Sequence, residues 1–429
     1  MLRLRNPKGS QISLWESVLP GELFQLSEEL QTVDRLLDDE RLMAPFMKRF
    51  HTRVGRPTVP IEVYLRLMYL KHRNGLGYET LVKEVGDSFM WRTFCRLSLD
   101  DRVPDPSTLI KLRKRFGEGI IEELNRLLLK KVAEEKLLRS KKLRVDTTVV
   151  EADIAYPTDA GLMADGVRVL TRTVKKIKSV GSAARVEFHN RTRTIKKRLL
   201  EIGKILRRRT GKNREEVDKV TRKIIRVAEE VVSSACRVYR SPQGQLGKIS
   251  DKEKLLRLVQ RLKEQLGLVE RVIAQARQVV VGNRHIPERV VSIFDPGARP
   301  IRKGKLKAPT EFGRKVVLGE SGDRIITAYR VLEGNPSDSE LLVPMVEEYA
   351  AVVGRQPEAV AADRGCSSSP NEGALAQLGV KRISLPQRGR KSKERRAYEQ
   401  QTWFRRLKRW RAGGEATISL LKRKFGLRR

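Results

Sequence analysis

The sequence lacks two features that mark large classes of protein: long apolar runs and paired cysteines. Its 429 residues include three cysteines, Cys95, Cys236 and Cys366, which are too far apart to form a CxxC pair. The cysteines therefore suggest neither a disulfide framework nor a zinc site. No run of about 18 apolar residues occurs, and the first 30 residues contain no signal-peptide core. We therefore expect a soluble, cytoplasmic protein with no membrane partner.

Acidic residues are scarce beside basic ones. Lys and Arg number 90 against 52 Asp and Glu, so the formal net charge is +38 at pH 7. Because basic side chains release condensed counterions when they neutralise phosphates, the natural partner is nucleic acid, above all double-stranded DNA. Aromatic residues make up only 5% of the chain but hydrophobic residues 39%, which favours folded, helix-rich cores in two or three domains.

Residues 1–135 are predicted to form an all-α, helix-turn-helix-like DNA-binding module. Within residues 60–88, apolar residues recur at helical spacing on both sides of a glycine-containing turn. The next helix is expected to begin near Ser107, whose residue type caps helices well. Basic residues near its start are candidates for DNA contact, although ordinary packed helices with solvated charges remain the alternative: Lys111, Arg113 and Lys114.

Residues 167–285 are predicted to form an inserted helical bundle. One helix carries apolar residues at alternating steps of four and three, namely Leu255, Val259, Leu262, Leu266, Val269, Ile273, Ala276 and Val280. A second amphipathic helix is expected over residues 217–235. This composition favours scaffolding, dimerisation or DNA-backbone contact over catalysis, and pairing within the chain over an intermolecular coil.

Residues 136–166 and 286–429 are predicted to form a mixed α/β domain, interrupted by the bundle after its first strand. Alternating residues over 143–150 indicate that strand, with Asp146 in its middle. Further short segments rich in β-branched residues are expected to be strands: 289–295, 311–320, 324–334, 359–363 and 381–386.

Three acidic residues are candidates for one site. Asp146 lies within the first strand, and Asp363 lies at the carboxyl end of a short apolar strand, where α/β proteins assemble sites. Glu415 shares a helix face with Arg411 and Lys422, four residues before it and seven after. Two Mg²⁺ ions need several carboxylate oxygens to offset their charge, whereas basic residues can hold a DNA backbone.

Other roles for the acids remain open. Asp363 is of a type common in turns, and Glu415 lies among charges common on solvated helix faces. Glu151 or Asp153 could replace Asp146 if the strand register differs. Asp295 is expected to start a turn. Asp338 could line the site, but a helix N-cap is the simpler role for it.

These residues and their surroundings resemble the DDE transposases of bacterial insertion sequences, in the group whose catalytic helix carries a Tyr-Arg-Glu-Lys signature. The matching segments are VDTTVVEADIAYPTDAGLM, FDPGARPIRKGK, EFGRKVVLGE, VLEGNPSDSELL and AADRGCSSSPNEGAL. Arg411, Glu415 and Lys422 fit the spacing of the signature, whereas Lys408 occupies its Tyr position.

The resemblance implies an RNase H-like, integrase-type catalytic core that uses two Mg²⁺ or Mn²⁺ ions. Asp146, Asp363 and Glu415 would be the catalytic residues and the metal ligands, and Arg411, Lys422 and Lys408 would contact DNA. It also implies cleavage at the ends of the element, strand transfer into target DNA, and a homodimer that holds two ends, in the bacterial cytoplasm at the nucleoid.

The end of the chain adds two expectations. The chain stops 14 residues after Glu415, which suggests a truncated catalytic domain and, as an alternative function, an inactive remnant that only binds DNA. A nuclease or resolvase on the same core is a third hypothesis. The last 49 residues contain 18 Lys and Arg against three acids, and Trp403, Phe404 and Trp410 among them either stack on an unpaired base or cover the sheet. Gly413 and Gly414 predict that Glu415 lies in the first turn of a new helix.

Overall fold

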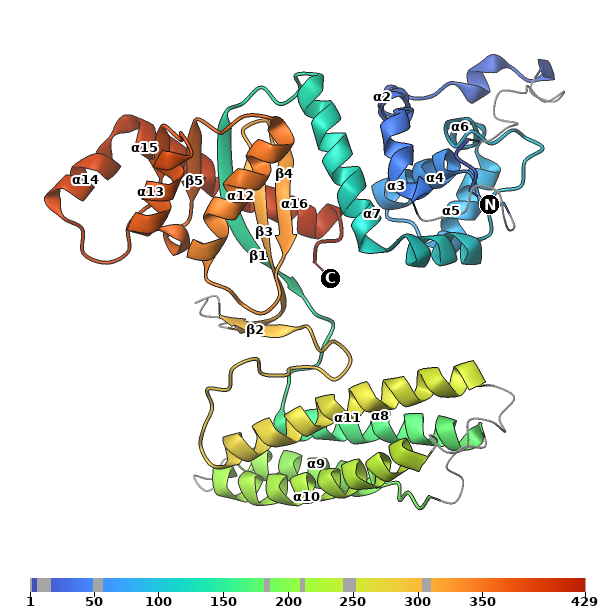
Figure 1. Ribbon diagram of the computed structural model, residues 1–429, viewed down its shortest axis with the longest axis vertical. Helices are drawn as coiled ribbons and strands as arrows, with labels where there is room; N and C mark the ends of the chain where they lie inside the picture. Colours follow the sequence, from blue (N-terminus) through green and yellow to red (C-terminus); the bar gives the residue numbers. More distant parts are fainter. Residues whose placement is uncertain are drawn as a thin grey trace. The chain divides into compact units, whose positions relative to one another are not determined.

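The computed structural model describes residues 2–5, 17–48, 57–180, 186–208, 213–241, 252–302 and 310–428 (Figure 1). The chain divides into two compact units. The first unit comprises Met1–Asp146, Leu318–Tyr329 and Ser337–Arg428, and the second comprises Thr147–Val317 and Arg330–Pro336. Within the described ranges, no helix is long and apolar enough to cross a membrane.

The N-terminal part of the first unit is helical. Its elements are η1 (Gly21–Phe24), α2 (Glu28–Leu37), η2 (Glu40–Met43), α3 (Ala44–Met47), α4 (Ile61–Asn74), α5 (Tyr78–Asp87), α6 (Phe89–Phe94) and α7 (Pro106–Glu134). Gly75 adopts a left-handed conformation, with φ 66°, at the turn between α4 and α5, which confirms the predicted pair of helices. Their predicted apolar positions lie in one core, including Leu67 and Val85, which are fully buried.

The start of α7 differs from the prediction. Asp105 caps this helix by accepting a hydrogen bond from the Ser107 backbone N–H at 2.8 Å, and Pro106 occupies the first helical position. Ser107 was therefore the wrong N-cap, because an Asp-Pro pair combines a capping carboxylate with a residue whose φ already suits the first turn. Gly117, with φ 70°, then kinks the helix.

Four helices of the second unit form a bundle: α8 (Asp159–Ser179), α9 (Thr192–Arg207), α10 (Asn213–Arg240) and α11 (Lys252–Val280). Helix α8 begins before the predicted Val167, at Asp159, because the Thr158 hydroxyl accepts a hydrogen bond from the Gly161 N–H. The predicted seam of α11 and the apolar face over residues 217–235 pack into one shared core, which confirms both helical patterns.

The described residues form one sheet, whose strands are β1 (Lys142–Glu151), β2 (Arg299–Arg302), β3 (Thr310–Ser321), β4 (Ile326–Val331), β5 (Ala359–Ala362) and β6 (Arg382–Ser384). Their order is β2-β3-β1-β5-β6, and β4 pairs with β3. Strand β1 is parallel to β5, which is parallel to β6, whereas β2 and β3 are antiparallel. The sheet is therefore mixed, as predicted, and it fits an RNase H-like fold.

One predicted strand does not form. The backbone N–H and C=O of Val290, within residues 289–295, bond instead to the side-chain amide of Gln275 on α11, at 3.1 and 3.0 Å. Val290 and Ile293 belong to the core of the bundle. The β-branched pattern of this segment thus reflects burial against a helix. The strand β2 follows it and was missed because RPIR has little β-strand character. The motif at residues 294–305 extends into residues 303–305, which lie outside the described ranges.

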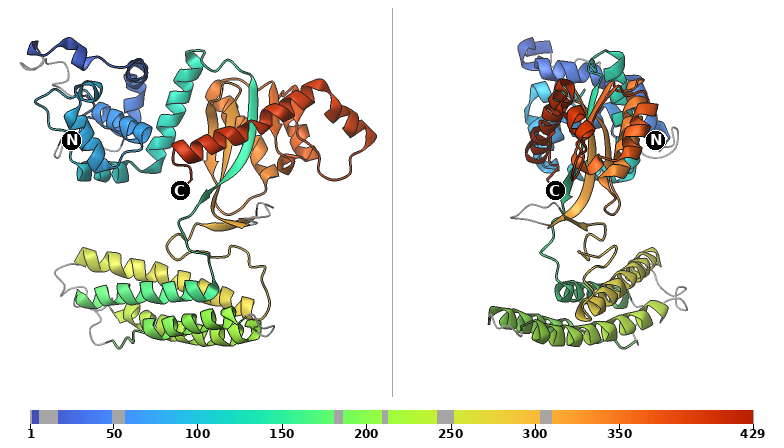
Figure 2. Two further views of the ribbon diagram at one scale, coloured as in Figure 1. Left: turned by 180° about the vertical axis from the view of Figure 1, so that it is seen from behind. Right: turned by 90° about the vertical axis from the view of Figure 1, so that its left-hand side faces the viewer.

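The remaining helices of the first unit cover both faces of its sheet. They are α12 (Asp338–Val353), η5 (Arg364–Cys366), α13 (Ser369–Gln377), α14 (Lys393–Gln400), α15 (Thr402–Ala412) and α16 (Gly414–Lys424). Figure 1 shows α12 in front of the sheet, and the reverse view in Figure 2 shows α16 crossing the opposite face. Because side chains alternate along a strand, Leu143 faces the α12 side, whereas Arg144 and Asp146 face α15 and α16.

Candidate active site

Asp146 and Asp363 lie side by side on neighbouring strands. In the parallel pairing of β1 with β5, Val145 lies opposite Ala362, so each aspartate directly follows a paired residue. Neighbouring strands are about 4.8 Å apart, so the carboxylates of Asp146 and Asp363 lie close together at the carboxyl end of β5. The Asp146 side chain is 16% exposed, while the Asp363 side chain is 55% exposed and therefore open to a ligand from solvent.

Arg411 joins the two aspartates. Its Nη2 donates hydrogen bonds to both carboxylate oxygens of Asp146, at 3.1 and 3.0 Å, and its Nη1 lies 3.9 Å from Asp363 Oδ1. The arginine is only 18% exposed. A single guanidinium therefore lies between both acids and offsets one of their two negative charges, and three residues distant in sequence meet at one point.

A buried ion pair fastens the helix that carries Arg411 to the sheet. Arg144 of β1 donates from Nε and Nη2 to the Glu320 carboxylate of β3, at 2.9 and 2.5 Å. The same guanidinium donates from Nη1 to the backbone carbonyl of Trp410 at 2.7 Å. Thr417 of α16 donates to Glu320 Oε1 at 3.1 Å. Arg144 and Glu320 thus connect the central strand to both α15 and α16.

Two glycines allow this close approach. A Cβ at Gly413 would lie 3.2 Å from Arg144 Nη1, and one at Gly414 would lie 3.3 Å from Arg144 Nε, both tighter than ordinary contacts. Helix α15 ends at Ala412 and α16 begins at Gly414, so Glu415 lies in the first turn of a new helix, as predicted.

Glu415 does not join the aspartate pair. Its side chain is exposed and forms no hydrogen bond or ion pair with any residue in the described ranges. Across those ranges, no group of three or more His, Cys, Asp or Glu side chains is arranged to hold a metal ion. The structure therefore brings together two of the three predicted acids, with Arg411 in place of the third.

The predicted DNA-contacting residues lie on three helices of the first unit. Lys408 on α15 is exposed, and Lys422 on α16 is half-buried. On α7, Lys111 and Lys114 are exposed, as is Arg113, whose Nη1 lies 3.5 Å from the hydroxyl of Tyr78. All except Lys422 have solvent-facing charges that a phosphate could reach.

The structure also decides between several alternatives for the other acids. The strand register puts Asp146, and not Glu151 or Asp153, next to Asp363. Asp295 does begin a turn, since its carbonyl accepts from the Ala298 N–H, and its carboxylate also forms an ion pair with Arg314 at 2.6 Å.

Asp338 is not the predicted N-cap, because Ser337 holds that position and Asp338 is the first residue of α12. Its Oδ2 lies 2.7 Å from the position that a Cβ on Gly365 would take, so its carboxylate packs against the turn after Asp363. Burial, and after it the charges of Asp338, Asp363 and Asp146, raise the pKa of the neighbouring Cys366 thiol to about 12. The sequence left open that Asp338 could line the site, and its contact with Gly365, close to Asp363, favours that alternative over the N-cap role.

The aromatic residues near the C-terminal end cover the sheet. Phe404 is fully buried, and Trp403 and Trp410 pack on a small core of Ala359, Ala361 and Leu407. Of the two alternatives for these aromatics, the structure favours covering the sheet over stacking on an unpaired base.

The donor set suits a hard divalent cation. Mg²⁺ prefers oxygen ligands and is often held by only one or two carboxylates, with waters and substrate phosphates completing its shell. Asp146 and Asp363 offer that pair of oxygen donors at an edge open to solvent. The arrangement fits one such ion without Glu415.

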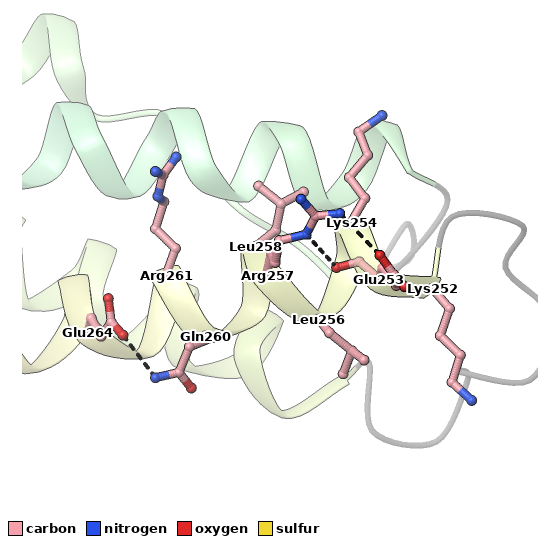
Figure 3. Close-up of a pocket in the computed structure, with 9 residues that line it drawn as sticks. All are labelled: Lys252, Glu253, Lys254, Leu256, Arg257, Leu258, Gln260, Arg261 and Glu264. Carbon is pink, nitrogen blue, oxygen red and sulfur yellow. Dashed lines mark hydrogen bonds and ion pairs between the residues drawn. The ribbon is translucent and has the colours of Figure 1, made fainter. Parts of the chain in front are cut away.

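One described pocket is formed by other residues. A surface hollow of about 1170 Å³ is lined by residues of α11 alone, from Lys252 to Glu264 (Figure 3). Four of its polar side chains form two hydrogen-bonded pairs, Arg257 with Glu253 and Gln260 with Glu264. It brings together no set of catalytic side chains, so the pair of strand-borne aspartates remains the better candidate.

Comparisons with known proteins bear on the family of the chain. The mixed sheet with paired acids fits the class of RNase H-like cores. Residues 20–115 match a family described as a transposase domain (DUF772), and residues 289–429 match the Transposase DDE domain family. The chain belongs to the DDE transposases of insertion sequences.

A curated relative is an uncharacterized protein, ORF8 in the nfe locus of Rhizobium meliloti, which is 33% identical over 132 residues. The match covers 30% of this chain and 64% of the relative, so the chain spans less than two thirds of that protein's length. No solved structure matches the chain.

Proposed function

We propose that this chain binds the ends of an insertion sequence in bacterial DNA, cleaves them with the help of Mg²⁺ or Mn²⁺, and transfers the cleaved strand to target DNA. The observation that carries the proposal is the meeting of Asp146, Asp363 and Arg411 at one edge of the sheet. Further support comes from the two transposase families, which match residues 20–115 and 289–429.

Each residue has a proposed role. Asp146 and Asp363 would hold the divalent cation, which supplies charge neutralisation for the scissile phosphate when it is bound. Arg411, released from Asp146, would hold a phosphate of the element end, since a guanidinium matches phosphate geometry with two parallel hydrogen bonds. Lys408 and Lys422 would extend this contact along the backbone of the end.

Glu415 is proposed as the third catalytic acid, and its exposed position indicates a rearrangement on DNA binding. Gly413 and Gly414 directly precede it, and glycine absorbs changes in backbone angle at little steric cost. In-line phosphoryl transfer depends on positioning and charge stabilisation, so a site completed only on DNA would restrict cleavage to the bound end.

The other parts of the chain have proposed roles too. Residues 1–135 would form the DNA-binding module, with Lys111, Arg113 and Lys114 of α7 contacting DNA. Residues 136–166 and 286–429 would form the catalytic domain and residues 167–285 its insertion. A homodimer would bring two element ends together.

A DNA-binding remnant without cleavage activity is the second candidate. The observation that favours it is the exposure of Glu415, since the described residues contain no group of three acids arranged to hold a metal ion. The two candidates differ in one property, the ability to nick DNA.

The test is incubation of the purified full chain with a labelled duplex of its element end and Mg²⁺. We expect nicking at the end, and a loss of at least about 100-fold in Asp146→Asn and in Asp363→Asn, because even outer residues of metal sites cost 10- to 100-fold. Glu151→Gln, on the same strand, is the matched control and should nick normally. Binding without nicking by the unaltered protein would support the remnant, and nicking that survives both aspartate changes would overturn the assigned site.

A further inference from the structure

Helix α9 of the bundle carries a row of exposed basic side chains: Arg193, Lys196, Lys197, Lys204 and Arg207. Their spacings of three, four and seven residues keep them on one side of an α-helix, because residues so spaced lie above one another. We call this set the α9 basic face.

The opposite side of α9 is fixed in the core. Ile195 and Ile205 are buried there, and Leu199 and Ile202 pack partly buried against the same core. The helix therefore cannot turn its basic residues inward, and the α9 basic face is held toward solvent.

The charge of this face is not balanced within the described chain. None of its five cations has a hydrogen bond or ion pair to another described residue. Neighbouring basic residues do have partners: Arg191 with Glu230 at 3.6 Å, Arg198 with Glu201 at 2.9 Å, and Arg208 with Glu216 at 3.9 Å.

The one acid of α9 is already occupied. Glu201 has a lowered pKa, first because Arg198 donates a hydrogen bond to it and then because Lys223 and Lys197 lie near. Lys223 belongs to α10, where Lys219, Arg222 and Arg226 are also exposed at helical spacing. Basic side chains therefore also occur on α10, where the exposed acids Glu215 and Glu230 lie on the same side as Lys219 and Arg226.

We infer that the α9 basic face is a second DNA-binding surface, which contacts the phosphates of double-stranded DNA without reading base sequence. From Arg193 to Arg207 the helix rises about 21 Å, at about 1.5 Å per residue. Duplex DNA carries one phosphate charge per about 1.7 Å of its axis, so this length meets several phosphates. The inference rests on the proposed function only in naming DNA as the partner.

Other occupants fit this face less well. A second copy of the bundle would present the same positive charge and be repelled. A membrane surface would require an apolar face on the same helix, and the apolar side of α9 is already buried in the core. A phosphate backbone offers the complementary charge without an apolar contact.

The test compares two variants of the full chain that each lose two Arg and two Lys. The first changes Arg193, Lys196, Lys204 and Arg207 to Gln. The matched control changes four exposed residues of α11 that are spread over more than one side of the helix, Lys252, Arg261, Lys263 and Arg271, to Gln. Glutamine has a helix propensity close to those of Lys and Arg, so both variants should fold, which urea denaturation verifies.

The measurement is affinity for a 30-base-pair duplex without element-end sequence, over a series of KCl concentrations. Each lost phosphate contact makes the negative slope of log K against log salt shallower by about 0.9. The slope of the α9 variant should therefore be shallower than that of the unaltered protein by about 2 to 4. The control should change by less than half as much. Equal changes in both variants, or no change in the first, would overturn the inference.

This outcome is separable from the fate of the proposed function. Binding to the non-specific duplex requires no cleavage, so it is measured even if the unaltered protein fails to nick element ends. Failure to nick would count against the transposition mechanism, whereas unchanged salt dependence would count against the α9 basic face.

Discussion

The ion pair between Arg144 and Glu320 gives the sharpest stability prediction. The two side chains are only 7% and 5% exposed, and they join β1, β3 and both helices of the candidate site. Substituting Glu320→Gln removes the negative charge and keeps the size of the side chain. Arg144 is then left as a buried cation without its carboxylate.

The expected cost is about 3–5 kcal/mol, the range for removing one partner of a buried ion pair. This is a large part of a typical unfolding free energy of about 5–15 kcal/mol. The double change Arg144→Met with Glu320→Leu should recover much of the loss, because neither charge then remains buried.

The assay is urea denaturation followed by tryptophan fluorescence, which includes Trp410 beside Arg144. The control is Glu358→Gln, which removes an exposed ion pair next to β1. In this pair Lys141 Nζ, in the residue before β1, lies 2.7 Å from Glu358 Oε1. Exposed pairs contribute little, so this control should shift the midpoint far less. Equal shifts for the two single variants would refute the assignment of Arg144 and Glu320 as a stabilising connection.

Two further predictions concern stability. A Cβ at Gly313 would lie 2.0 Å from the Val150 carbonyl oxygen, so Gly313→Ala should lower the urea midpoint, whereas Gly267→Ala, with open space inside α11, should raise stability by up to about 1 kcal/mol. A higher midpoint for Gly313→Ala than for Gly267→Ala would contradict the close packing of β1 against β3. Hydrogen bonds from Arg41 lower the pKa of Asp39 from 3.8 to about 2, so its stabilising effect is complete above pH 3.8 and is lost as the pH falls toward 2. The stability gap between the unaltered protein and Asp39→Asn should therefore narrow from pH 5 to pH 3, and a constant gap would argue against this role.

Local signals in the sequence predicted the individual elements well. The alternation around Asp146 and the apolar run before Asp363 correctly indicated the strands β1 and β5, because each pattern depends on residues a few positions apart. The heptad seam of α11 was equally local. Where a pattern had two physical causes, the prediction failed: residues 289–295 are β-branched because they are buried against Gln275, not because they pair with a strand.

The assembly of the site could not be read in the same way. Arg144 and Glu320 are separated by 176 positions, and nothing near either residue indicates its partner. The contact of Arg411 with Asp146 depends on the parallel register of β1 with β5 and on the packing of α15. Helical spacing placed Glu415 on the same face as Arg411, but the break at Gly413 begins a new helix, and the acid is exposed there.

The most direct test of the central claim is Mn²⁺ binding, measured by the loss of the free-ion electron paramagnetic resonance signal during titration of the full chain. If the two strand-borne aspartates hold the divalent cation, the unaltered protein and Glu151→Gln will bind Mn²⁺ alike. Asp146→Asn and Asp363→Asn will each lose that binding. Retention of Mn²⁺ by both aspartate variants at the affinity of the unaltered protein would contradict the account.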